Sequence, residues 1–413
     1  MAQPAISSDT PARISPRERE PQPCRGGQHK VAAGRRRGWL AVAVAAIGTF
    51  SVVTVETLPA GLLTSIAGGL RIPEAQVGLM VTATGLVASL AAAVLPVAIR
   101  RLDRRAVLVW LIGLTVFGNA LTAIAPDFAV LLVSRSLIGI SIGGFWSLAA
   151  GLAVRLVPAD EVPKATSVIF SGAMVANVLG VPAGTLLGTL TSWRLAFAAA
   201  AGFGALLVVV LLFVLPRMPA EQPVSVRTVL EQLRTPAVRM GVLATLLLVS
   251  GHYGAFTFVS PILQKISGIH AHTVGVLLLG YGTAAIAGNF VAGAAAARNV
   301  RVAIIAVSLL FVATLIALPL IGTTPLTGTL LLIVWGLAFG GLPVSVQTWI
   351  LKSAPTATEA ATGLNTCAFN LAIALGALSA SVVAGSVALT AVLWLAVALV
   401  GATSLAVWRT PEH

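Results

Sequence analysis

Charged residues are scarce in this sequence. They make up 9% of its 413 residues, whereas a soluble globular domain is about 25% charged. Hydrophobic residues reach 57%, although aromatic residues contribute only 6%. Apolar runs of about 20 residues recur along the chain, and each is long enough to cross a hydrocarbon core. The chain therefore has too few charges to cover a surface in water, and its solvent must be lipid.

Cysteine pairs, metal-ligand spacings and nucleotide-binding loops are also missing. The two cysteines, Cys24 and Cys367, lie in a polar segment and in an apolar run, which argues against a disulfide between them. No Gly-x-x-x-x-Gly-Lys-Ser/Thr stretch occurs, so ATP-driven chemistry is not indicated. No nucleophile–base pattern stands out either. We therefore expect no metal, no cofactor and no enzymatic activity.

Basic residues exceed acidic ones by 26 to 13, which gives a net charge of +13. In a soluble protein this balance would suggest nucleic acid as a partner. Here the basic residues sit in short loops, which is the pattern that orients membrane proteins. Only Arg71, Arg194 and Lys265 fall on the side opposite to most of them. We expect no nucleic-acid partner, and a multi-pass protein of the cell (inner) membrane with both termini in the cytoplasm.

The apolar runs predict an all-α protein with twelve transmembrane helices in two six-helix bundles. A basic, proline-containing stretch separates the sixth run from the seventh. Two halves of six spans are the arrangement of one large transporter class, with the substrate site near the membrane midplane between the halves. The expected spans are residues 39–66, 76–99, 106–125, 128–155, 165–190, 195–215, 240–260, 272–296, 302–321, 326–350, 357–385 and 388–408.

The remaining segments are polar. The amino-terminal stretch has no apolar period and is expected to be disordered, and the apolar run that follows it does not resemble a cleaved signal peptide. The expected organisation is a basic cytoplasmic tail (1–38), an amino-terminal bundle (39–215), a cytoplasmic central loop (216–238), a carboxy-terminal bundle (239–408) and a short cytoplasmic tail (409–413).

Two motifs lie in the fourth and fifth expected spans. The first is Arg135-Ser-Leu-Ile-Gly139, and the second centres on Gly180-Val-Pro182-Ala-Gly184. They resemble the fourth-span motif and the fifth-span antiporter motif of the major facilitator superfamily, in its drug:proton antiporter branch with twelve spans. The usual Gly-Pro pair of the antiporter motif is opened here to Gly-Val-Pro. The resemblance covers roughly residues 39–408 and implies a proton-coupled transporter with the major facilitator fold.

A narrower resemblance rests on the region after Gly143. The stretch Gly143-Gly-Phe-Trp146, with residues 155–158 and 162–170, is similar to purine ribonucleoside efflux pumps. Arabinose-efflux-type permeases share much of this pattern. The resemblance implies export of purine ribonucleosides or of similar small polar molecules, with sugar or multidrug efflux as the alternatives.

The loop between the second and third spans departs from the family pattern. Arg100 stands where the family has an aspartate, and Asp103 stands where it has a glycine. Asp103 can supply the acidic partner of a loop-to-helix latch from this shifted position. A solvated basic loop that obeys the orientation rule explains Arg101, Arg104 and Arg105 without any latch, and we favour that interpretation for these three arginines.

Three residues are candidates for proton coupling. Glu56 is the acidic residue that we place inside a span, where an ionised carboxylate is expensive and burial favours the neutral form. The guanidinium of Arg135 keeps its proton, so it can only stabilise a carboxylate or relay protons through water. His252 titrates near neutral pH in its free form. Each also has a structural alternative: a hydrogen-bonded neutral Glu56, an Arg135 paired with Glu56 or with the backbone of the first span, and a buried neutral His252.

Amides and rings in the spans are candidates for substrate binding. An amide donates and accepts hydrogen bonds without carrying charge, which suits a neutral polar substrate, although such groups also join neighbouring helices. A tryptophan can stack on a base or lie at the membrane interface. The candidate substrate-binding residues are Trp146, Asn177, Tyr253, Gln347, Asn365 and Asn370.

The fifth span carries small residues at a spacing of four, which places them on one helix face and allows close packing. Pro182 removes a backbone hydrogen bond and can bend the helix. This span is therefore a candidate hinge, although ordinary small-residue packing explains the same pattern. The candidate hinge residues are Gly172, Gly180, Pro182, Gly184 and Gly188.

Taken together, these observations predict a secondary active transporter that exchanges protons for a small-molecule substrate by alternating access. Its partners would be protons, the substrate and the lipid bilayer, and we expect a monomer. A membrane sensor without transport is the alternative from another class. Such a sensor needs a soluble signalling domain, and the sequence contains none.

Overall fold

The computed structural model of the chain describes residues 25–99, 102–219, 231–355 and 357–409. The predictions for residues 1–24, Arg100, Arg101, residues 220–230 of the central loop and residues 410–413 fall outside this described part. Within it, twelve helices are long and apolar enough to cross a membrane. The predicted all-α class and all twelve predicted spans are confirmed. Helices are the expected solution because lipid offers no hydrogen-bond partners to an open backbone.

The first half of the chain contains six spans, of which the fifth is built from three consecutive pieces. Its elements are α1 (Arg25–Leu70), α2 (Glu74–Ala98), α3 (Arg104–Ile124), α4 (Phe128–Leu156), η1 (Ala159–Glu161), α5 (Val162–Val175), η2 (Ala176–Gly180), α6 (Val181–Leu190) and α7 (Trp193–Val214).

The second half repeats the six-span arrangement after a short 3-10 turn. Its elements are η3 (Gln232–Arg234), α9 (Pro236–Thr257), α10 (Val259–Lys265), α11 (Ala271–Arg298), α12 (Val300–Ile321), α13 (Pro325–Ser353), α14 (Thr358–Ser386) and α15 (Leu389–Arg409).

Small polar residues set the beginnings of several spans. Asp127 accepts a hydrogen bond from the Val130 backbone nitrogen at 3.0 Å and caps α4. Ser192 caps α7 and Asn299 caps α12 in the same way. Each side chain satisfies one of the backbone N–H groups that the first turn of a helix leaves unpaired. The polar residues between the apolar runs therefore fix where the helices start.

Two predicted boundaries need correction. α1 begins at Arg25, so residues 25–38 are helical rather than disordered. This stretch contains no proline, and a helix already nucleated in a span extends because each added residue gains a hydrogen bond without a new nucleus. The central loop also ends earlier than expected, because α9 begins at Pro236. Proline suits a first helical position, where its missing N–H costs nothing.

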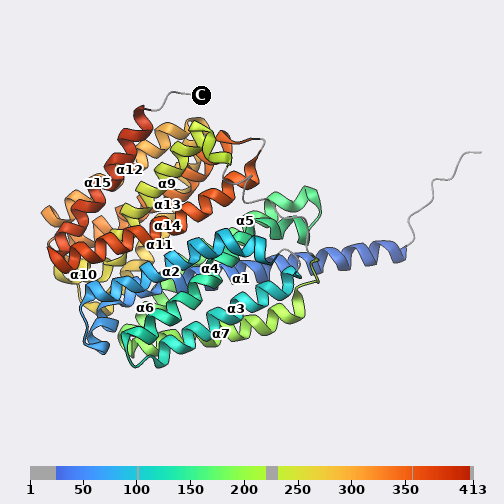
Figure 1. The fold of residues 1–413 in the computed structure, drawn as a ribbon, viewed down its shortest axis with the longest axis horizontal. Helices are drawn as coiled ribbons and strands as arrows, with labels where there is room; N and C mark the ends of the chain where they lie inside the picture. The colour runs from blue at the N-terminus through green and yellow to red at the C-terminus, as the bar shows by residue number, and fades with distance from the viewer. Residues whose placement is uncertain (1–24, 100–101, 220–230, 356, 410–413) are drawn as a thin grey trace, which may run out of the picture.

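The two bundles lie side by side in Figure 1, with α1 to α7 below and α9 to α15 above. They approach each other on the left, near α10, and their helices diverge toward the right and top. We call the side where α1 ends and α10 lies the distal side, and the side where α1 begins and α15 ends the terminal side. The depth of a residue is its position along the helices between these two sides.

A glycine pattern shows that the two bundles are built alike. α4 contains Gly-x-x-x-Gly-Gly at 139–144, and α13 contains the same pattern at 336–341. A Cβ atom added to Gly143 would overlap a backbone carbonyl of α2, and one added to Gly340 would overlap a backbone carbonyl of α11. The fourth span of each half therefore packs backbone to backbone against the second span of that half.

Candidate functional site

Glu56 lies near the middle of α1 and is only partly buried. The indole of Trp146, in α4, lies beside its carboxyl group. Trp146 in turn packs against Phe145 and Phe170, with ring centroids 6.3 and 5.8 Å apart. The amino-terminal bundle thus offers an acidic group and an aromatic face at one point.

Tyr253 of α9 belongs to the other bundle, and its phenol lies near enough to the Glu56 carboxyl for the two groups to interact electrostatically. The Tyr253 ring packs edge to face against Phe369 of α14, with 6.2 Å between ring centroids, and against Phe339 of α13, with 6.5 Å between centroids. The structure therefore brings Glu56, Trp146 and Tyr253 together between the two bundles. This is the candidate functional site.

Arg135 is fully buried in α4. Its Nη1 donates to the backbone oxygen of Val55 at 3.2 Å, and its guanidinium carbon lies 4.8 Å from the centroid of the Phe197 ring. Glu56 and Arg135 are both described residues, and no ion pair joins them. Of the two structural alternatives for Arg135, the structure shows the hydrogen bond to the backbone of the first span. The accepting residue, Val55, directly precedes Glu56 in the chain. Its Nε and Nη2 have no hydrogen-bond partner in the described part of the chain.

His252 is buried among rings of the carboxy-terminal bundle. It stacks on Phe339 with 4.3 Å between centroids and on Phe256 with 5.3 Å. The indole nitrogen of Trp335 donates to His252 Nδ1 at 3.2 Å. An imidazole that accepts at Nδ1 carries its hydrogen at Nε2 and is neutral. This arrangement matches the structural alternative for His252, and its role in proton coupling stays a prediction.

Two of the predicted substrate-binding amides belong to a chain of hydrogen bonds inside the carboxy-terminal bundle. Thr245 Oγ1 donates to Asn365 Oδ1 at 2.7 Å, and Asn365 Nδ2 donates to Gln347 Oε1 at 3.1 Å. Gln347 Nε2 continues to Thr362 Oγ1 at 3.2 Å. These contacts join α9, α13 and α14, so in this conformation both amides serve as links between helices.

Asn177 and Asn370 bind back to their own helices. Asn177 Nδ2 donates to the Ala173 oxygen at 3.0 Å, and Asn370 Nδ2 donates to the Thr366 oxygen at 2.9 Å. The buried Oδ1 of Asn370 has no partner among the described residues. Neither amide is among the contacts that hold Glu56 and Trp146 together.

The regular α-helix of the fifth span is interrupted just before its proline. Residues Ala176–Gly180 form one turn of π-helix, and the Val181 backbone nitrogen donates to the Ala176 oxygen. Pro182 follows immediately and has no N–H to continue the regular ladder. A π-turn of this kind often marks a functional position. The interruption of the α-helix is present, while a bend at Pro182 and its use as a hinge stay predictions.

The glycines of the fifth span face α1 along its length. A Cβ atom at any of them would press on that helix, and the pairs keep a constant register. The pairs are Gly172 with Ala46, Gly180 with Thr54, Gly184 with Leu58 and Gly188 with Leu62. The small residues therefore pack the fifth span closely against the helix that carries Glu56.

Asp103 is a helix cap. Its Oδ1 accepts hydrogen bonds from the backbone nitrogens of Arg105 at 2.8 Å and of Met218 at 3.3 Å. The Arg104 backbone nitrogen donates to the Met218 oxygen at 2.9 Å, and an Arg105 guanidinium nitrogen donates to the Leu212 oxygen. The start of α3 is thereby tied to the chain that leaves α7. Asp103 thus acts within its own bundle here, in place of the expected latch.

Sequence reasoning missed a polar cluster on the distal side. Lys265 Nζ lies 2.9 Å from Glu74 Oε2 and joins α10 to α2. Gln264 Nε2 donates to Thr64 Oγ1 at 3.0 Å and to Ser260 Oγ at 2.8 Å. The only sequence signal was the placement of Lys265 outside the main set of basic residues. These contacts tie the two bundles together at this end.

The bundles also pack closely at two helix pairs. A Cβ atom at Gly85 of α2 would lie 2.9 Å from the backbone of Ala374 in α14, and one at Gly282 of α11 would lie 2.6 Å from the Asn177 oxygen. Ser89 Oγ of α2 donates to the Cys367 oxygen of α14 at 3.2 Å. The bundles thus meet from mid-depth to the distal side, while Figure 1 shows them spreading toward the terminal side.

Comparisons with known proteins agree with this geometry. The chain is 32% identical over 372 residues to the purine ribonucleoside efflux pump NepI of Escherichia coli (strain K12), with 90% of this chain and 94% of that protein covered. The relative from Shigella flexneri matches equally. Among solved structures, the nucleoside transporter NupG superposes with a TM-score of 0.74 at 13% identity, covering 89% of this chain and 99% of that one.

A bacterial homologue of the human lysosomal transporter Spinster, in an inward-facing and unoccupied conformation, superposes with a TM-score of 0.68 at 14% identity. It covers 90% of this chain and 96% of that one. At these identities the solved structures support the fold alone. The family model described as Major Facilitator Superfamily matches residues 45–377. With twelve spans and this match over most of its length, the chain belongs to the major facilitator superfamily and is a multi-pass membrane transporter rather than an enzyme.

Proposed function

We propose that the protein is a proton-coupled antiporter that exports purine ribonucleosides, or similar small polar molecules, by alternating access. The observation that carries the substrate class is the 32% identity to a purine ribonucleoside efflux pump over 90% of this chain. The proposed orientation places the terminal side in the cytoplasm, as the distribution of basic residues indicates. The distal contacts then close the outer side, and the central site is reached from the cytoplasm.

The chemistry of the central site supports this proposal. Glu56 is the acidic residue of the candidate site, and intramembrane acids are functional by default. When the carboxylate takes up a proton it loses its charge, and its attraction for the neighbouring Trp146 N–H group weakens, because an ionised acceptor binds a donor more strongly than a neutral one. Proton uptake therefore changes the contact between α1 and α4 beside the substrate position. Proton binding and substrate binding can exclude each other through this contact.

The rings around the site suit a planar base. Trp146 and Phe170 approach from one bundle, and Tyr253 and Phe369 from the other. Stacking of a base on an aromatic ring contributes about 1–3 kcal/mol. A base held between the bundles would contact both halves and would therefore bind best when they are close together.

One observation favours the alternative of multidrug efflux. A broad drug site is expected to have more rings and fewer free amides, and here Gln347 and Asn365 already satisfy each other while His252, Phe256 and Phe339 gather beside Tyr253. An amphiphilic aromatic compound would suit such surroundings. A nucleoside carries the hydroxyl groups of its ribose, whereas an amphiphilic aromatic drug need not. Transport assays with both kinds of compound therefore distinguish the two proposals.

The deciding experiment uses proteoliposomes loaded with radiolabelled inosine, arabinose or members of a drug panel under an imposed proton gradient. The proposal expects gradient-dependent movement of inosine that an uncoupler abolishes. Liposomes without protein serve as the control for leak. Gradient-dependent movement of arabinose or of drugs, without movement of inosine, would contradict the nucleoside assignment and leave the transporter class intact.

A further inference from the structure

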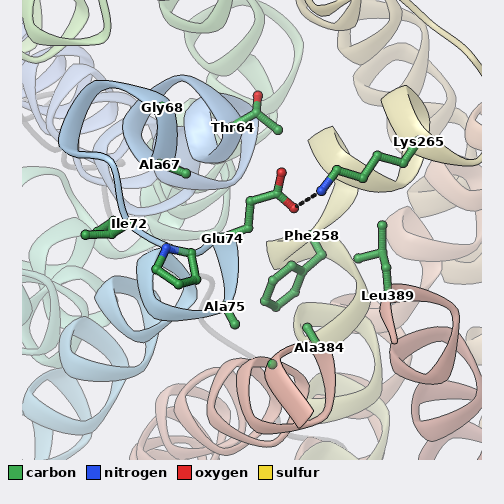
Figure 2. A pocket seen from close by; sticks show the side chains of 12 residues that line it. Thr64, Ala67, Gly68, Ile72, Glu74, Ala75, Phe258, Lys265, Ala384 and Leu389 are labelled. Atoms are coloured by element: carbon green, nitrogen blue, oxygen red, sulfur yellow. Dashed lines mark hydrogen bonds and ion pairs between the residues drawn. The ribbon is translucent and has the colours of Figure 1, made fainter. Parts of the chain in front are cut away.

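A cavity of about 640 Å³ opens on the distal side between the two bundles. Figure 2 shows side chains from both halves around it. The amino-terminal half supplies Thr64, Ile72 and Glu74, and the carboxy-terminal half supplies Phe258, Lys265 and Leu389. Its size lies in the range of small-molecule sites, which are mostly apolar with a few convergent polar groups. This cavity is separate from the central site around Glu56.

The polar groups of the cavity also hold the bundles together. Glu74 and Lys265 form an ion pair across it at 2.9 Å, and the Thr64 hydroxyl accepts a hydrogen bond from Gln264 at 3.0 Å. Because opposite walls belong to different bundles, separation of the bundles on this side would pull the cavity apart. A ligand that touches both walls can therefore bind only while this side is closed.

The charges in the cavity select the kind of ligand. The carboxylate of Glu74 and the ammonium of Lys265 cancel, so the cavity has no excess charge for an ion to neutralise. Lys265 keeps further N–H donors, since an ammonium group has three, and a carboxylate has acceptor sites beyond the one in the ion pair. A neutral molecule with several hydroxyl groups can use both. Ile72, Phe258 and Leu389 provide an apolar wall for a ring.

We propose that this cavity is an external binding site for a neutral, hydroxyl-bearing ring compound, and that its occupant holds the distal side closed. The choice of a ribonucleoside as occupant rests on the proposed function. A ligand that binds one of two conformations shifts the equilibrium toward it by the factor 1 + [L]/Kd. Exported nucleoside that accumulates outside would thus slow further export. At an external concentration equal to Kd, the expected slowing is about twofold.

The first test measures binding without transport. Ala384 lines the cavity, and the A384C variant, with Cys24 and Cys367 replaced by serine, provides a label site. Right-side-out vesicles without a gradient receive a membrane-impermeant maleimide from outside. External inosine is expected to slow labelling, whereas inosine 5′-monophosphate is not, because its phosphate dianion has to compete with the Glu74–Lys265 pair.

The second test measures efflux of preloaded radiolabelled inosine as a function of external inosine. In the L389W variant, a larger side chain on the cavity wall fills the cavity. The efflux rate of each variant with external inosine is compared with its own efflux rate without it. L405W is the matched control, because Leu405 lies on the same helix but is 47% exposed on its outer surface. The proposal expects L389W to lose both protection and slowing, and L405W to keep both.

The outcomes separate this proposal from the proposed function. Protection of A384C that L389W abolishes, in vesicles that export no inosine, would support the external site and overturn nucleoside export. Normal export of inosine with no protection, or with slowing that survives in L389W, would overturn the external site. Equal protection by inosine and its monophosphate would overturn the preference for a neutral ligand.

Discussion

The amino-terminal and carboxy-terminal bundles share a backbone plan but differ in what they bury. Both pack their second and fourth spans through the Gly-x-x-x-Gly-Gly pattern. The first bundle has Glu56 and Arg135 at mid-depth, whereas the charged residues of α9 to α15 all lie near helix ends. The second bundle has stacked rings around His252 and the amide pair Gln347–Asn365 in their place.

This difference suggests that the two bundles, although built alike, have different functions. A charge inside the membrane is costly and is kept where it has a use, which points to proton coupling in the first bundle. Neutral rings and amides are cheaper to bury and select shape rather than charge. We therefore propose that α1 and α4 couple transport to protons and that α9, α13 and α14 select the substrate. The experiments that follow test this assignment, from the largest expected effect to the smallest.

The strongest test is E56Q. The amide keeps the size of the side chain but cannot bind and release a proton, so gradient-driven efflux should fall to the rate of empty liposomes. Exchange of substrate without a gradient should persist, because the rings around the site are unchanged. D160N is the matched control, since Asp160 is exposed and lies outside the central site. Full gradient-driven transport by E56Q would remove coupling from the first bundle.

The next test addresses the shared scaffold through G340A. The new methyl group would overlap the carbonyl oxygen of Ala285 in α11, and overpacking typically costs about 1–3 kcal/mol. We expect a lower melting temperature in detergent, measured by fluorescence-detected size exclusion after heating. G113A is the control, because a Cβ atom at Gly113 meets nothing within 4 Å. Equal melting temperatures for the two variants would argue against tight packing of α13 on α11.

Substrate selection is tested by Y253L. Loss of the ring removes a stacking surface from the central site, which should weaken nucleoside binding by about 1–3 kcal/mol. The expected signature is a higher KM for inosine with a retained response to the proton gradient. L405W, on the lipid-facing surface, provides the reference. A loss of gradient response with unchanged KM would move coupling into the second bundle.

The smallest expected effect comes from H252F. The ring is kept within the stack, while the buried N–H of Trp335 loses its acceptor, at a cost of about 1–3 kcal/mol. Gradient-driven efflux should continue, with a slightly lower melting temperature. W335F removes the same hydrogen bond but also leaves a cavity in place of the fully buried indole, so its melting temperature should fall further than that of H252F. If H252F behaved like E56Q in the efflux assay, His252 would belong to the proton pathway.

Most of the fold followed from the apolar runs. Twelve spans and the six-plus-six division were predicted and are present. The helical start of α1 was missed because polar residues can continue a helix that a span has already nucleated. The role of Asp103 was missed for a similar reason. Whether Asp103 caps a helix depends on where the backbone N–H groups of the next turn point, which the sequence does not show. The sequence pattern instead raised the possibility of a latch.

The candidate site was only partly predictable. Glu56, Trp146 and Tyr253 were named as polar or aromatic residues inside spans, and the structure brings them together. The partner of Arg135 was not predictable, because it depends on how α1 and α4 are rotated about their axes. The same applies to Gln347 and Asn365, whose spacing along the chain does not reveal that they satisfy each other.

By itself, the sequence determined the solvent of this protein, the number of its spans and the chemical groups placed inside them. Hydrophobicity and length decide these features locally, one helix at a time. Only the tertiary structure decided which groups meet: Arg135 with the backbone beside Glu56, His252 with Trp335, and Lys265 with Glu74. Each contact joins helices distant in sequence, and the rotation and depth of those helices arise from packing of the whole bundle.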